Sequence, residues 1–98
     1  MDIYRFKRVV SRLTYEDHRV QNVGIRIEEG FVSYEFKLNS EGNHLDICSY
    51  LHSINDELRD VAFAEVHRRN DEWTVEITYR PVDQIEYLDL KTFLESLS

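Results

Sequence analysis

Glycine, proline and cysteine are all scarce in this sequence, with three, one and one residue respectively among 98. So few glycines argue against a glycine-rich loop that cradles phosphate with backbone amides. The lone Cys48 excludes an internal disulfide framework and fits a reducing compartment. We therefore expect a cytoplasmic protein.

Long apolar runs and catalytic motifs are also missing. The longest apolar runs are only a few residues, whereas a helix that crosses a bilayer needs roughly 20, and charged residues follow Met1-Asp2 at once. The sequence contains no Gly-x-Ser-x-Gly, no His-Glu-x-x-His and no paired-cysteine motif. These absences predict a non-catalytic protein without a cofactor or a membrane segment.

The composition and length of the chain predict one folded domain. Hydrophobic residues make up 42% of the chain and charged residues 32%, which is enough apolar material for a core and enough charge for a solvated surface. The length suits one modest core and is too short for two. We expect a single domain over residues 1–98.

Acidic side chains dominate the charge, which is −7 overall. Residues 1–27 carry six basic and three acidic side chains, whereas residues 28–98 carry six basic and sixteen acidic ones. An acidic field argues against direct binding to nucleic acid, which depends on neutralising phosphates with Lys and Arg. It favours a basic protein partner, although acidic surfaces also serve simply to keep small proteins soluble.

The segment 23–38 predicts a β-hairpin, because apolar residues occupy every second position on both sides of Glu29-Gly30. With these two residues as the turn, the register pairs Ile27 with Val32, Ile25 with Tyr34 and Val23 with Phe36. All of these side chains then share one face of the sheet.

A second hairpin is expected around Asn70-Asp71. That turn pairs Val66 with Val75, Ala64 with Ile77 and Ala62 with Tyr79. Pro81 stops the second strand because proline cannot donate to a ladder. On the outer face the same register sets Glu65 directly across from Glu76, and two facing carboxylates cost stability.

Helical periodicity follows each hairpin. After a loop over 39–43, a helix is predicted from the apolar stripe Ile47, Tyr50, Leu51, Ile54 and Leu58. The C-terminal stretch predicts another helix that starts near Asp89, which would be its N-cap.

Residues 3–13 fit either a strand, with a bulge near Lys7-Arg8, or a helix. Their aromatic and β-branched composition favours the strand.

These elements predict an α+β domain whose antiparallel sheet has four to five strands, with two helices mainly on one face. The expected order is β-(α)-β-β-α-β-β-α, and αββαββα is the alternative if the first element is helical. With a short helix within residues 12–20, the first order resembles a ferredoxin-like or ACT-like arrangement, mostly over residues 23–69. That resemblance implies a regulatory module that homodimerises and binds a small ligand, although ACT-like domains commonly place glycine in the first strand-to-helix connection and none lies between Met1 and Val23.

The nearest approach to a metal-binding pattern is the row His44, Cys48 and His52, since residues four apart on a helix are neighbours and all three are good zinc ligands. The row drifts by about 80° around the helix axis, so ligation by all three is strained. No fourth ligand is evident, and Cys48 also reads as a small apolar residue at the core margin. We therefore predict no metal site here.

The leading functional hypothesis is a small acidic inhibitor, of the immunity, antitoxin or phage-antagonist type, that binds a basic nucleic-acid-handling protein. The residues expected to contact that partner are the hairpin carboxylates Glu65, Glu76, Glu72, Asp71, Glu28, Glu29 and Glu35. The alternative is the homodimeric, ligand-binding regulatory module. Apolar side chains on the outer face, such as Phe31 and Phe63, need a cover, which either the C-terminal helix or a second copy would provide.

Overall fold

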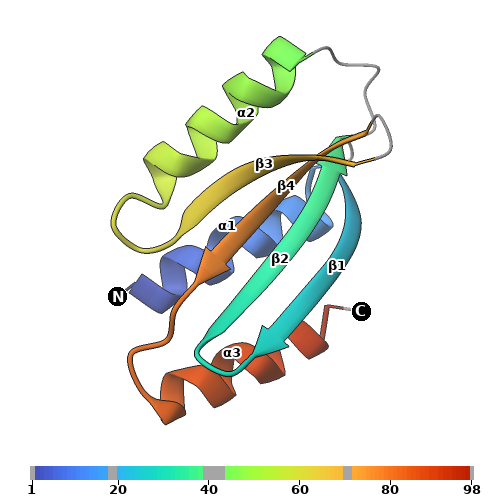
Figure 1. Cartoon of the computed structure of the whole chain (residues 1–98). Coiled ribbons are helices and arrows are strands. Elements are labelled where there is room, and N and C mark those ends of the chain that lie inside the picture. Colours follow the sequence, from blue (N-terminus) through green and yellow to red (C-terminus); the bar gives the residue numbers. More distant parts are fainter. Residues whose placement is uncertain (1, 18–19, 39–43, 70–71, 98) are drawn as a thin grey trace.

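A computed structural model describes residues 2–17, 20–38, 44–69 and 72–97, with the backbone alone at 2, 44–47 and 69. The chain alternates single helices with pairs of strands (Figure 1). The elements are α1 (Asp2–Tyr15), β1 (Val20–Glu28), β2 (Phe31–Leu38), α2 (His44–Glu57), β3 (Phe63–Arg69), β4 (Glu72–Tyr79) and α3 (Gln84–Glu95). None of these described helices is long and apolar enough to span a membrane.

The four strands form one antiparallel sheet in the order β1-β2-β4-β3. Each hairpin pairs internally, and the two hairpins join through β2 and β4, which lie at the centre of the sheet (Figure 1). The tight turn at Glu29-Gly30 is confirmed, and Gly30 has a φ of 93°, a conformation that side-chain-bearing residues rarely adopt. Joining the hairpins through β2 and β4 leaves β1 and β3 as the sheet edges.

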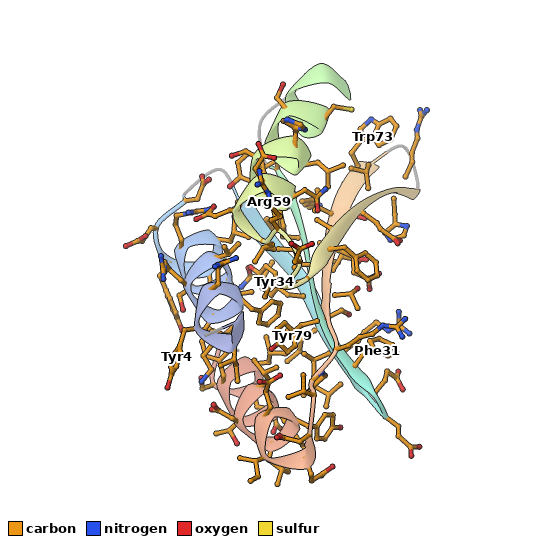
Figure 2. All side chains as sticks on the ribbon, turned by 90° about the vertical axis from the view of Figure 1, so that its left-hand side faces the viewer. Tyr4, Phe31, Tyr34, Arg59, Trp73 and Tyr79 are labelled. Carbon is orange, nitrogen blue, oxygen red and sulfur yellow. The ribbon has the colours of Figure 1, made fainter. Side chains whose placement is uncertain are left out.

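All three helices lie on one face of the sheet, and Figure 2 shows Tyr34 and Tyr79 between the sheet and the helices. The buried core consists of Ile3, Phe6, Val9, Val10, Leu13, Val32, Tyr34, Phe36, Ile54, Leu58, Ala64, Val75, Ile77, Tyr79, Leu90 and Leu94. The predicted α+β class is therefore confirmed. Because α3 packs on the same side as α1 and α2, the C-terminal helix does not cover the outer face.

The preferred strand assignment for residues 3–13 was wrong, because these residues belong to α1. Their apolar side chains recur at the three- and four-residue spacing of a helix, and those of Phe6, Val9, Val10 and Leu13 are fully buried. One buried helical stripe outweighs the strand propensity of individual aromatic and β-branched residues. The observed order is the alternative, αββαββα, and the ferredoxin-like arrangement is not confirmed.

In the first hairpin, the two pairs nearest the turn match the prediction, but Val23 is not opposite Phe36. The register shifts between Asn22 and Gly24, so Val23 is the extra residue of a β-bulge and is half exposed. Beyond the bulge the alternation changes phase, which brings Asn22 opposite Phe36. Apolar alternation by itself does not reveal such an inserted residue.

The second hairpin also has the predicted register, with Val66 opposite Val75 and Ala64 opposite Ile77. The predicted pair of Ala62 with Tyr79 is absent from the ladder, because β3 begins one residue later, at Phe63. The predicted turn at Asn70-Asp71 lies outside the described residues.

The predicted start of the C-terminal helix near Asp89 was wrong by about one turn, since α3 begins at Gln84. Asp83 is the N-cap, and its side chain accepts a hydrogen bond of 2.8 Å from the Glu86 amide. Ile85 and Leu88 lie off the buried stripe of this helix and are exposed. A good cap therefore extends the helix beyond its apolar stripe.

One ion pair joins α1 to α2. The Arg12 guanidinium donates to both carboxylate oxygens of Glu57, at 2.6 and 2.7 Å. This hydrogen bonding lowers the pKa of the Glu57 carboxyl, while partial burial opposes the shift. The side chain of Arg12 is 39% exposed and that of Glu57 is 34% exposed. Solvent screening therefore keeps the contribution of this ion pair to folding stability at or below about 1 kcal/mol.

We expect this pair to make folding stability depend on pH in the acidic range. Because the folded pKa of Glu57 lies below its unfolded value, its stabilisation is complete above the unfolded pKa and is lost as pH falls through the folded pKa. Glu57→Gln should therefore unfold at lower urea concentration than wild type at pH 7, and this difference should shrink as pH approaches 3. Glu16→Gln, an exposed carboxyl at the end of α1, is the control. A difference that stays constant with pH contradicts this account.

Candidate functional site

The outer face of the sheet is the face that no described helix covers (Figure 2). Side chains opposite in phase to the core residues project there. From β1 and β2 they are Arg26, Glu28, Phe31, Ser33, Glu35 and Lys37, and from β3 and β4 they are Phe63, Glu65, His67, Glu72, Thr74, Glu76 and Thr78. Most of the predicted partner-binding carboxylates thus share one surface.

Three glutamates form a row across adjacent strands of this face. Glu65 on β3 is directly opposite Glu76 on β4, as predicted, and Glu76 is directly opposite Glu35 on β2. The second pairing was not expected, because neither hairpin pattern says which strands join the hairpins. Like charges directly opposite each other destabilise a sheet, so this row requires a compensating charge or hydrogen bond.

The central carboxylate, Glu76, receives that compensation from β1 and β2. Its side chain is only 13% exposed, and its Oε2 atom lies 3.5 Å from Nη1 of Arg26. The Ser33 hydroxyl, itself buried, donates to the same oxygen at 3.2 Å. An arginine of this chain thus relieves part of the repulsion, and Glu76 is held in place rather than free to swing out.

His67 lies beside the glutamate row. Its Nε2 atom is 3.4 Å from Oε1 of Glu76 and 3.7 Å from Oε2 of Glu65. This nitrogen is buried and has no hydrogen-bond partner in the described part of the chain. The predicted register set Glu65 opposite Glu76 but assigned no role to His67. Because His67 lies two residues after Glu65 on one strand, both side chains project from the same face.

The remaining predicted carboxylates form the rim of the face. Glu72 pairs with Lys37 at 3.2 Å, and Glu28 lies 3.9 Å from Arg26. Glu29 is exposed in the turn between β1 and β2, and Asp71 lies outside the described residues. The outer face therefore mixes acidic side chains with fewer basic ones.

The helical row His44, Cys48 and His52 does not form a donor group among the described side chains. Cys48 is half-buried, and His52 is 81% exposed with its Nε2 atom 3.7 Å from Asp56. The side chain of His44 lies outside the described residues. Within the described chain, the histidine and acidic donors that do converge are those of Glu65, His67 and Glu76, whose ligand atoms all lie within 4.8 Å of one another.

A separate apolar pocket of about 210 Å³ lies between the β1 bulge and α3, lined by Asn22, Val23, Gly24, Ile25, Tyr34, Leu94 and Leu97. The polar lining residues Tyr34 and Asn22 are hydrogen-bonded to each other, since the Tyr34 hydroxyl donates to Oδ1 of Asn22. Burial raises the pKa of this hydroxyl, and a hydrogen bond from Thr14 opposes the shift. The lining is mostly apolar with two polar residues, as in many small-ligand sites, although the pocket is small for one.

No family model matches this chain, and neither the curated proteins nor the solved structures contain a significant match. Function is therefore argued from the geometry of the outer face and of the pocket.

Proposed function

We propose that the protein is a non-catalytic binding protein whose outer sheet face contacts a basic segment of a protein partner. The observation that carries this proposal is the row Glu35, Glu76 and Glu65 on the face without helices. A partner that presents Lys and Arg would relieve the repulsion left in this row. An acidic inhibitor of a nucleic-acid-handling protein is the type of protein that fits, because its carboxylates would occupy the positions of phosphates.

The most accessible carboxylates are those of Glu65, at one end of the row, and of Glu28 and Glu72 on the rim. Glu28, Glu65 and Glu72 have side chains that are 52%, 54% and 58% exposed, whereas Glu76 is held by Arg26 and Ser33. A partner's cations would therefore reach the rim first and meet Glu76 only at the centre of the contact. Association driven by such rim charges is fast and weakens as salt is raised.

We expect the double variant Glu28→Lys/Glu65→Lys to bind the partner at least about tenfold more weakly, a loss of roughly 1.4 kcal/mol. The partner would be recovered from native lysate at low salt, identified by mass spectrometry, and titrated by calorimetry. Glu76 is left intact, because a lysine there would face Arg26 and destabilise the sheet.

Glu16→Lys/Glu95→Lys is the matched control, since it reverses the same number of exposed charges at the ends of α1 and α3. Equal affinity of the outer-face variant and wild type, or an equal loss in the control, contradicts the proposal.

The second candidate is a regulatory module that homodimerises and binds a small ligand, and the apolar pocket beside α3 is the observation that favours it. Recovery of binding partners from native lysate distinguishes the two candidate functions. If the protein retains only further copies of itself at low and at high salt, the acidic-inhibitor proposal fails. A dimer whose melting temperature rises with one metabolite then supports the regulatory module.

A further inference from the structure

We infer that Glu65, His67 and Glu76 form a binding site for a divalent transition-metal ion such as Zn²⁺ on the outer face of the sheet. This inference goes beyond partner binding and does not depend on it. It stands on the placement of three donor atoms of suitable type, on their separations, and on a buried imidazole nitrogen that has no hydrogen-bond partner among the described residues.

The two hairpin strands place the donors. Glu65 and His67 are two residues apart on β3, so their side chains project from the same face, and Glu76 is directly opposite Glu65 on β4. Paired strands hold side chains more precisely than loops do. All three donors thus belong to one rigid element, the second hairpin.

The distances between donor atoms suit a small ion. A tetrahedral ion with metal–ligand bonds of about 2.1 Å has its ligand atoms roughly 3.4 Å apart. Nε2 of His67 lies 3.4 Å from the nearer oxygen of Glu76 and 3.7 Å from that of Glu65. All three ligand atoms lie within 4.8 Å of one another, so side-chain adjustment would be needed to bring them onto one ion.

The imidazole nitrogen Nε2 of His67 is the donor atom that lacks a partner among the described residues. Nε2 of His67 is buried among carboxylate oxygens without a hydrogen bond in the described chain, and buried polar atoms in native proteins are almost always satisfied. A cation bound by this nitrogen and by the two carboxylates would give all three groups a partner. The alternative is a hydrogen on Nε2 that points toward the carboxylates, and the experiment distinguishes this arrangement from a bound metal ion.

Neighbouring groups orient the Glu76 carboxylate for ligation. Ser33 and Arg26 both engage its Oε2 atom, which directs the other oxygen, Oε1, toward His67. Outer-shell hydrogen bonds of this kind orient metal ligands. Arg26 brings one positive charge, but the two ligand carboxylates, Glu65 and Glu76, outnumber it, so the site stays favourable for a cation.

The donor set selects the class of ion. One imidazole with two carboxylates suits Zn²⁺ and similar first-row ions, whereas Ca²⁺ and Mg²⁺ prefer oxygen ligands and more of them. Three protein ligands leave a coordination position open to water or to a donor from another molecule. We therefore expect Zn²⁺ and Co²⁺ to bind in preference to Mg²⁺.

The test is calorimetric titration of the untagged, chelator-treated full chain with ZnCl₂ at pH 7, with MgCl₂ in parallel. We expect one Zn²⁺ per chain and no comparable Mg²⁺ binding. His67→Gln and Glu76→Gln should each weaken Zn²⁺ binding at least about tenfold, the size of effect seen even for outer-shell changes. His52→Gln is the matched control, because His52 also lies beside a carboxylate, that of Asp56, and should bind Zn²⁺ as wild type does.

Absence of Zn²⁺ binding, or equal binding by wild type and His67→Gln, overturns the site. Circular dichroism checks that each variant is folded, and Glu65→Gln, at an exposed position, replaces any variant that is not. His67→Gln keeps both carboxylates, so it also separates this inference from the proposed function. If His67→Gln loses Zn²⁺ binding but still binds the partner, both proposals stand. The Glu28→Lys/Glu65→Lys variant removes a metal ligand as well as partner contacts, so it is used only to test partner binding.

Discussion

Replacing Phe6 by alanine is expected to lower the free energy of unfolding by about 3–5 kcal/mol. Phe6 is fully buried in α1, and its ring centroid lies 5.2 Å from that of Tyr79 on β4. The substitution removes this aromatic contact and leaves a cavity between the helix and the sheet. Because small domains are stable by only about 5–15 kcal/mol, such a loss should lower the melting temperature by on the order of 20 °C.

Denaturant titration followed by circular dichroism measures this effect. Tyr4→Ala is the matched control, because Tyr4 is an aromatic residue of the same helix whose side chain is 58% exposed. Its substitution should change stability by about 0.5 kcal/mol or less. Similar losses for Phe6→Ala and Tyr4→Ala would contradict the packing of α1 on the sheet.

Leu94→Ala has the second largest expected effect, a loss of about 2–5 kcal/mol. Leu94 is fully buried where α3 packs on the sheet, and it also lines the pocket beneath the β1 bulge. The substitution removes packing and enlarges that pocket, so the surrounding side chains have little chance to close the space. The loss should therefore lie toward the upper end of this range.

The control for Leu94→Ala is Leu88→Ala on the same helix, since Leu88 is 51% exposed and should contribute little. Thermal unfolding by calorimetry compares the two variants. A larger loss for Leu88→Ala than for Leu94→Ala would mean that α3 presents a different face to the sheet.

Partner binding and metal binding draw on the same carboxylates. Glu65 and Glu76 would meet a partner's cations in one case and a metal ion in the other. A bound divalent ion would neutralise much of the row and reduce its attraction for a basic surface. A basic partner and a metal ion would therefore compete for the outer face, unless the partner itself supplies a ligand at the open coordination position of the ion.

The sequence determined the parts of the fold that depend on short-range pattern. The alternation of apolar residues and the turn at Glu29-Gly30 predicted that Ile27 pairs with Val32, and the structure confirms it. The same reasoning placed Glu65 opposite Glu76. Within a hairpin these pairs follow from the two-residue period of a strand and from the length of the turn, both of which are local.

Only the tertiary structure decided how those parts combine. Joining β2 to β4 placed Glu35 beside Glu76 and brought Arg26 from the edge strand within 3.5 Å of it. Burial against the sheet decided that residues 3–13 form a helix, although their composition suits a strand. Such outcomes depend on contacts between residues far apart in the chain, which the local periodicity of a single sequence does not contain.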